Sequence, residues 1–160
     1  AIPTIIPQHQ LIEETKMPRR QIGSIIAGRG LVSAARDMSV RAACALMAEN
    51  HIGALAVVEN GRIAGIFTER DALVRVLAEG LNPQTTPLTA VMTLDPMTVH
   101  PDQPFMSALH LMYENGFRHV PVAENGRPLG MVSARDALEL ETAEFEATLH
   151  QREHLRTIMA

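Results

Sequence analysis

Two stretches of this chain share one pattern at a fixed distance. Residues 65–73 read GIFTERDAL, and residues 130–138 read GMVSARDAL, an offset of 65 residues. The same offset brings the ENGR of residues 59–62 onto the ENGR of residues 124–127. A unit that recurs at a fixed spacing indicates repeated supersecondary structure, so the chain is expected to hold one fold unit twice.

The length of the chain favours packing the two copies together. The chain has 160 residues, of which 46% are hydrophobic. A single copy of roughly 55–65 residues would lie near the lower limit of independent stability. The two repeats are therefore expected to share an interface and to fold as one unit.

Each copy of the motif has the features of a strand that runs into a helix. A glycine and two apolar residues end a buried strand, Thr68 or Ser133 stands at the N-cap position, and Asp71 or Asp136 lies in the first turn. Ahead of each motif an Asn-Gly pair predicts a tight hairpin. A Ser/Thr followed three residues later by an acid also resembles a capping box, which needs no ligand.

Hydrophobic periodicity places the remaining elements. We expect a helix at 38–50 capped by Asp37, and further helices at 68–78, at 104–115 and from 133 or 134 onward. Strands are expected at 31–34, 54–59, 63–67, 97–100, 118–123 and 129–132. The resulting divisions are an N-terminal extension at 1–24 with a short helix at 10–16, a first repeat at 25–80, a linker at 81–89, a second repeat at 90–140 and a helical tail at 141–160. The tail is expected to serve in packing or dimerisation.

Composition argues against several classes of function. The net charge is −4 and no run of lysine or arginine occurs, which argues against a nucleic-acid partner. No apolar run approaches the ~20 residues of a membrane span, and no secretory signal is visible. One cysteine, Cys44, favours a reducing, cytoplasmic location. No metal-ligand spacing and no nucleophile elbow are found, so we predict no enzyme, no metal site and no required cofactor.

The order strand-helix-strand-strand-helix, with its Gly-apolar-apolar-Ser/Thr-x-Arg-Asp ending, resembles the CBS domain family in its tandem form, the Bateman module. Val91-Met92-Thr93 and Val120-Pro121-Val122 add to the resemblance, which covers residues 25–140. It implies an α+β fold of two repeats about a pseudo-twofold axis, often paired into a flat homodimer. It also implies two clefts that bind adenosine-containing ligands such as AMP, ADP, ATP, NAD or S-adenosylmethionine, with AMP the leading candidate here.

The resemblance assigns roles by matching position. The motif aspartate would hold the ribose hydroxyls, the Ser/Thr would lie near the ribose or phosphate, and short-strand residues would meet the adenine edge. One site would then hold Asp71, Thr68, Ser33 and Ala34, and the other Asp136, Ser133, Thr98 and Val99.

The residue types suit a nucleotide. A carboxylate accepts hydrogen bonds from both ribose hydroxyls, and a helix N-terminus attracts phosphate. Arg70 or Arg135 could add a fork of donors. With 3% aromatic residues, adenine would have to lie between aliphatic and methionine side chains, for which Ile52, Leu55, Met97 and Val120 are the candidates.

The two sites are expected to differ. The second repeat has Arg118 and His119 leading into a strand that contains Pro121, whereas the first has Gly53 and Ala54 at the corresponding places. Most phosphate contacts are therefore expected from the second repeat. Two hypotheses stand: a nucleotide-sensing regulatory module with an unknown protein target, and a dimerisation module whose clefts are degenerate.

Overall fold

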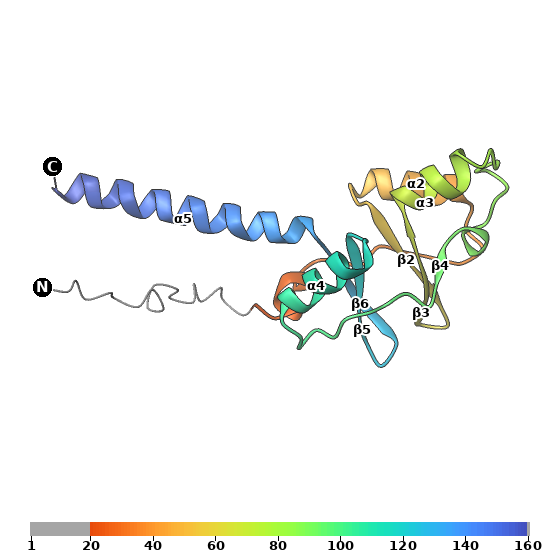
Figure 1. Cartoon of the computed structure of the whole chain (residues 1–160), viewed down its shortest axis with the longest axis horizontal. Coiled ribbons are helices and arrows are strands. Elements are labelled where there is room, and N and C mark those ends of the chain that lie inside the picture. Colours follow the sequence, from red (N-terminus) through yellow and green to blue (C-terminus); the bar gives the residue numbers. More distant parts are fainter. Residues whose placement is uncertain (1–19, 160) are drawn as a thin grey trace, which may run out of the picture.

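The computed structural model describes residues 20–159, which form two similar units and a long C-terminal helix (Figure 1). The first unit contains strand β1, helix α2, strands β2 and β3, helix α3 and the π-helical turn η1. Their bounds are Ser33–Ala34, Val40–Glu49, Ala54–Glu59, Arg62–Thr68, Glu69–Asp71 and Ala72–Leu77. The second unit contains α4 at Phe105–Asn115, β5 at His119–Glu124, β6 at Arg127–Ser133 and α5 at Arg135–Met159.

Both units are built on an antiparallel hairpin, but the first unit has four paired strands and the second has two. In the first, β2 and β3 form an antiparallel hairpin, β1 adds in parallel to β2, and β4 (Thr93–Leu94) adds to the free edge of β3. In the second, β5 and β6 form the hairpin, and Val99 alone bridges in parallel to Val122. The strand predicted at 97–100 is therefore reduced to a single bridge.

Both hairpins turn where the sequence predicts. Asn60 and Gly61 have φ angles of 52° and 73°, and Asn125 and Gly126 have 51° and 80°. Two successive positive φ angles are the requirement of a type I′ turn, which Asn-Gly meets at little cost. β6 lies against β2 and β3, so the two hairpins form the interface between the units.

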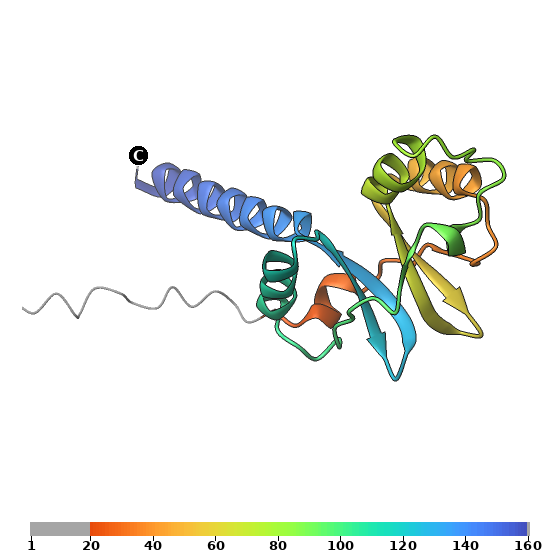
Figure 2. The ribbon, with the colours of Figure 1, turned by 45° about the vertical axis from the view of Figure 1, so that its right-hand side comes forward.

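The two units exchange short helices: the helical turn that precedes each unit in the sequence packs into the core of the other unit. Helix α1 (Ile22–Ile26) packs into the core of the second unit, and the 3-10 turn η2 (Leu88–Ala90) packs into the first. Figure 2 shows the two connecting segments, orange and green, passing between the units. Residues 22–24, expected in an extension, thus belong to a helix that the second core needs.

The motif glycines allow this exchange. A Cβ on Gly65 would lie 2.6 Å from Sδ of Met92, and a Cβ on Gly130 would lie 3.0 Å from Cβ of Ile26. A side chain at either position would therefore force the neighbouring residues, Met92 and Thr93 or Ile26, to shift. The glycines therefore serve close packing, in addition to ending the strand.

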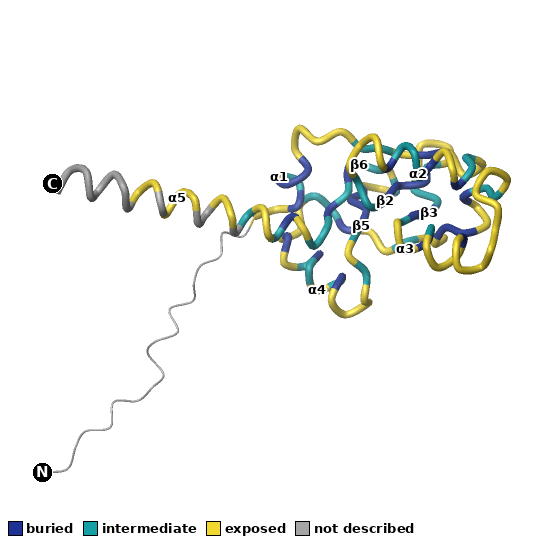
Figure 3. The backbone as a smooth tube through the Cα atoms, turned by 90° about the horizontal axis from the view of Figure 1, so that it is seen from above, coloured by how far each residue is buried: buried dark blue, intermediate teal, exposed yellow. Residues whose placement is uncertain are grey.

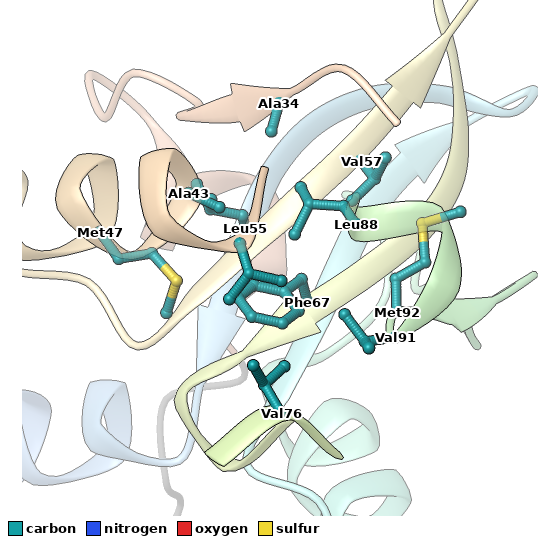
Figure 4. Close-up of a cluster of buried hydrophobic side chains, with 11 residues drawn as sticks. Ala34, Ala43, Met47, Leu55, Val57, Phe67, Val76, Leu88, Val91 and Met92 are labelled. Carbon is teal, nitrogen blue, oxygen red and sulfur yellow. The ribbon is translucent and has the colours of Figure 1, made fainter. Parts of the chain in front are cut away.

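Two separate cores result. The first, drawn in Figure 4, gathers Leu55, Val57 and Phe67 of the hairpin with Ala43 and Met47 of α2 and with Leu88, Val91 and Met92 from the linker side. The second gathers Val120, Val122 and Val132 with Phe105, Ala108 and Met112 of α4 and with the isoleucines of α1. Buried stretches accordingly follow α1 and the strands in Figure 3.

Several local predictions need correction. Helix α2 is capped by Ser39, whose side chain accepts from the backbone N of Ala42 at 3.2 Å, so the Asp37 cap was wrong. The helix at 68–78 has its N-cap at Thr68 and its end near Gly80 (φ 67°), but its second half is π-helical. Helix α5 leaves the body of the protein (Figures 1 and 2). The helix expected at 10–16 lies outside the described residues.

Candidate functional site

Each motif aspartate is buried at the start of a helix. Asp71 is 9% exposed and Asp136 is 5% exposed. Oδ2 of Asp71 accepts from the backbone N and from Oγ1 of Thr68, both at 2.9 Å. Oδ2 of Asp136 accepts from the backbone N of Ser133 at 2.6 Å and from its Oγ at 3.3 Å. The full capping box is present at Thr68, whose Oγ1 also accepts from the backbone N of Asp71 at 3.2 Å, whereas Ser133 shows the half in which the aspartate is the acceptor. In both cases these contacts use only Oδ2 of the aspartate.

A cavity of about 910 Å³ lies beside Asp136. We call it the Asp136 cleft. Its walls come from the loop after α1, the C-terminal end of α2, the start of β5 and the motif. Its lining includes residues 29–32, 50–54, 118–119 and 133–136, together with Leu138 and Glu139.

A second cavity of about 870 Å³ lies beside Asp71, and we call it the Asp71 cleft. Its lining includes Ile66, Thr68, Glu69, Arg70, Asp71, Val74, Arg75, Thr93, Pro121 and residues 95–97 and 115–119. Both volumes are in the range of small-molecule sites, about 300–1,000 Å³.

The exchange of helices changes how the predicted residues group. Ser33, Ala34, Thr98 and Val99 line neither cleft, and Ala34 and Val99 are buried at 5% and 4% exposure. The residues just before each short strand line the cleft of the other motif, so 29–32 face Asp136 and 95–97 face Asp71. The predicted pairing of short strands with motifs was therefore wrong, because the chain crosses between units before each strand begins.

Some of the other predicted residues line the expected cleft, and some line the other one or neither. Arg70 lines the Asp71 cleft and Arg135 lines the Asp136 cleft, whereas Pro121 lines the Asp71 cleft and not the one expected. Of the candidates for adenine contact, Ile52 and Met97 line the clefts. Leu55 and Val120 are fully buried in the two cores and reach neither cleft.

Glu69, Arg118 and His119 line both clefts. Nη2 of Arg118 lies 3.5 Å from Oε1 of Glu69, a contact between the two units. Arg118 and His119, predicted to serve one site, therefore lie in the wall between the two clefts and can contact a ligand in either. The sequence analysis missed Glu69 and Arg29, and Arg29 binds Asp136 directly.

Burial lowers the pKa of His119 below its ordinary value, and Arg118 lowers it further. Glu69 and Asp136 act in the opposite direction without reversing the shift. The folded protein thus holds this histidine neutral more firmly than the unfolded chain does.

The consequence is an acid-dependent loss of stability. The unfolded chain takes up the proton near pH 6.5 and the folded protein only at lower pH, so the contribution of His119 is present above about pH 6.5 and is lost as the pH falls below it. We expect urea unfolding to show this loss between about pH 7 and pH 5, and to show less of it in His119→Gln. The exposed His110 provides the matched control, His110→Gln. Equal pH dependence in wild type and His119→Gln would contradict the assignment.

Among the described residues, no cluster of histidine, cysteine and carboxylate side chains could hold a metal ion. In the same part of the chain, every helix is too short or too polar to cross a membrane.

The arrangement of duplicated motifs, exchanged helices and two clefts has a counterpart among known proteins. The family model for the CBS domain matches residues 22–78 and again residues 88–142. The chain belongs to the CBS domain family. It is a tandem CBS pair with the expected α+β fold.

Individual CBS proteins show the same likeness. CBS domain-containing protein CBSCBSPB2 of Arabidopsis thaliana is 34% identical over 72% of this chain, and this chain spans only 22% of that relative. A solved CBS-domain protein from Burkholderia ambifaria MC40-6 is 34% identical, with a TM-score of 0.72 over 77% of this chain and 94% of that one. The CBS pair of protein MJ0100 is 23% identical, with a TM-score of 0.71 over 79% and 99% of the two chains, and shares the fold.

Proposed function

We propose that this CBS pair is a regulatory module that binds adenosine-containing ligands in the Asp71 and Asp136 clefts. One observation carries the proposal. In each of two cavities of about 910 and 870 Å³, a buried aspartate at a helix N-terminus has one oxygen committed to the cap, while the other pairs with an arginine side chain, Arg29 or Arg75. A second carboxylate oxygen is what the hydroxyls of a ribose require.

The surroundings of each aspartate fit the rest of such a ligand. Arg70 and Arg75 border the Asp71 cleft, Arg135 borders the Asp136 cleft, and Arg118 serves both. Guanidinium groups at a helix N-terminus suit phosphate. Ile52 and Met97 offer apolar surface to a base. AMP is our leading candidate, because it combines the three parts at the smallest size.

A structure of the same fold carries ligands of this class. The MJ0100 pair was crystallised with 5′-methylthioadenosine and S-adenosyl-L-methionine. At 23% identity the likeness extends to the fold. The choice of ligand here rests on the side chains of this chain. We propose a binding role for both clefts and no catalytic role.

A thermal-shift screen against AMP, ADP, ATP, NAD, NADH and S-adenosylmethionine tests the proposal. A ligand at 100 times its Kd adds about 2.7 kcal/mol, which is about 5–10 °C for a chain of this size. We expect a selective upward shift with at least one of the six. No shift with any of them at millimolar concentration would favour the dimerisation module.

A homodimer is the second part of the proposal, and exposed apolar side chains favour it. Leu73 and Leu77 on η1 are 58% and 72% exposed, and Leu138 at the start of α5 is 63% exposed. These helices follow the two motifs, and leucines on them would be covered by a second copy.

The dimer is tested by the mass of the protein in solution. We expect wild type at twice the mass of the chain and Leu77→Arg at the mass of one chain, since a charge cannot be buried unpaired at such an interface. Tyr113 on α4 is 89% exposed, and Tyr113→Arg is the control that should remain dimeric. Wild type at the mass of one chain would overturn the proposed dimer.

A further inference from the structure

The two clefts differ in what holds the second oxygen of their aspartates. In the Asp136 cleft, Nη1 of Arg29 donates to Oδ1 of Asp136 at 2.5 Å, while Nη2 lies 3.3 Å from Oε2 of Glu139. With Oδ2 held by Ser133, both oxygens of Asp136 are engaged within the protein. The pKa of Arg29 is raised, chiefly by its hydrogen bond to Asp136.

In the Asp71 cleft the corresponding ion pair is longer. Nε of Arg75, on the same helix, lies 3.4 Å from Oδ1 of Asp71. Nη1 of Arg75 donates to the carbonyls of Val91 and Met92, at 3.0 and 3.2 Å. The guanidinium of Arg75 is therefore shared between Asp71 and the backbone, and its contact with Oδ1 of Asp71 is the longer of the two arginine–aspartate pairs.

The difference arises in the connecting segments. Ile26 contacts Gly130, and Met92 contacts Gly65 in the equivalent way. The segment that contains Arg29, just after Ile26, therefore corresponds to residues 93–97, just after Met92. The second segment contains no lysine or arginine, and its first two residues are held in β4. Arg29 instead lies in a turn between Gly28 (φ 73°) and Gly30, outside any strand, with its side chain 46% exposed.

Arg29 must move if Asp136 is to bind a ribose. A side chain on a glycine-flanked turn, with almost half its surface in solvent, can swing away at modest cost. An uncharged nucleoside would leave the guanidinium without its partner, a loss comparable to breaking a charge-assisted hydrogen bond. A ligand with a phosphate offers Arg29 a new anion in the same cleft.

We propose that Arg29 is a specificity-determining residue of the Asp136 cleft, which occupies the Asp136 carboxylate in the free protein and transfers to an anionic group of the ligand. The Asp136 cleft then accepts phosphate-bearing adenosine ligands and discriminates against adenosine itself. The Asp71 cleft accepts either. This inference rests on the proposed function, since it concerns how one of the two clefts chooses among ligands.

Calorimetry with AMP and adenosine tests the role of Arg29. All proteins carry Asp71→Ala, which weakens binding in the Asp71 cleft, and the isotherms are fitted with two sites so that the affinity of the Asp136 cleft is obtained separately. We expect AMP to bind at least about tenfold more tightly than adenosine when Arg29 is present, the lower end of a charge-assisted hydrogen bond. In Arg29→Gln the preference should shrink towards unity, because adenosine binds more tightly and AMP more weakly.

Arg36 provides the matched control. It lines neither cleft, its side chain is 45% exposed, and its Nη1 lies 2.9 Å from Oε2 of Glu59. Arg36→Gln removes the same charge outside the clefts, so the affinities for AMP and for adenosine should stay unchanged. Arg29→Lys keeps the charge and should keep a preference for AMP, which preserves the test if Arg29→Gln does not fold.

The outcomes separate the two proposals. If AMP and adenosine bind but their affinity ratio is the same in Arg29→Gln, the role of Arg29 is overturned and the proposed function stands. If neither compound binds any of these proteins and the thermal-shift screen is also negative, the proposed function falls, and the role of Arg29 falls with it.

Discussion

Replacing Ile22 with alanine is expected to lower the free energy of unfolding by about 2–5 kcal/mol. Ile22 is fully buried, and it packs with Ile25 and Ile26 against the core of the second unit. A cavity at this point would be bordered by α4 and by the β5–β6 hairpin, which cannot easily collapse onto it. For a chain of this length the melting temperature should fall by about 4–20 °C.

The control for this prediction lies on the same helix. Ser24 is exposed, and its hydroxyl bonds only to the carbonyl of Gln21, so Ser24→Ala should change stability by less than about 0.5 kcal/mol. Denaturant unfolding followed by circular dichroism measures both variants. If Ile22→Ala were as stable as Ser24→Ala, α1 would not be part of the second core.

The pairing of hairpins and helices was predictable because it is local. An Asn-Gly turn requires two positive φ angles, and a threonine or serine before an acid fixes where the helix begins. The repetition at an offset of 65 residues supported each assignment, because the same pattern predicted the same element in both copies. Asp37 misled the analysis because Ser39, two residues on, is an equally good cap and lies closer to the first helical residue, Val40.

The exchange of α1 and η2 was not predicted, because local sequence patterns do not specify which of two similar hydrophobic cores a helix packs against. A signal for it was present. Ile22, Ile25 and Ile26 recur at the spacing of Leu88, Val91 and Met92. The shared spacing indicates two equivalent helical turns. The first turn begins at Ile22, within the predicted N-terminal extension at residues 1–24.

The candidate site, like the fold, was predictable where its contacts are local in the sequence. The motif gave both aspartates and their caps, because those contacts span three residues. The opposite wall of each cleft depends on which connecting segment crosses to it, and hence on the exchange. Arg29 was therefore missed, although it stands between two glycines that make an exposed turn. Arg118 was expected to serve one site and borders both, because β5 starts at the wall between them.

Replacing Asp71 with alanine is expected to weaken AMP binding in the Asp71 cleft by about 10- to 150-fold. That range is the loss of a charge-assisted contact of about 1.5–3 kcal/mol. Asp71 lines the cleft, and its Oδ1 lies 3.4 Å from Nε of Arg75, a longer ion pair than the one between Asp136 and Arg29, so a ribose can compete for this oxygen more easily. The loss of the carboxylate near the helix N-terminus should cost about 0.5–1 kcal/mol of stability in addition.

Calorimetry separates the two effects of the substitution. Ser39→Ala removes the cap of α2, lines neither cleft and should cost about 1 kcal/mol of stability. If Asp71→Ala lost affinity only because the fold was weakened, Ser39→Ala would lose it too. We expect Ser39→Ala to bind AMP as wild type does. AMP binding that was unchanged in both Asp71→Ala and Asp136→Ala would leave the two aspartates as helix caps alone, and the tandem would then act through its surfaces.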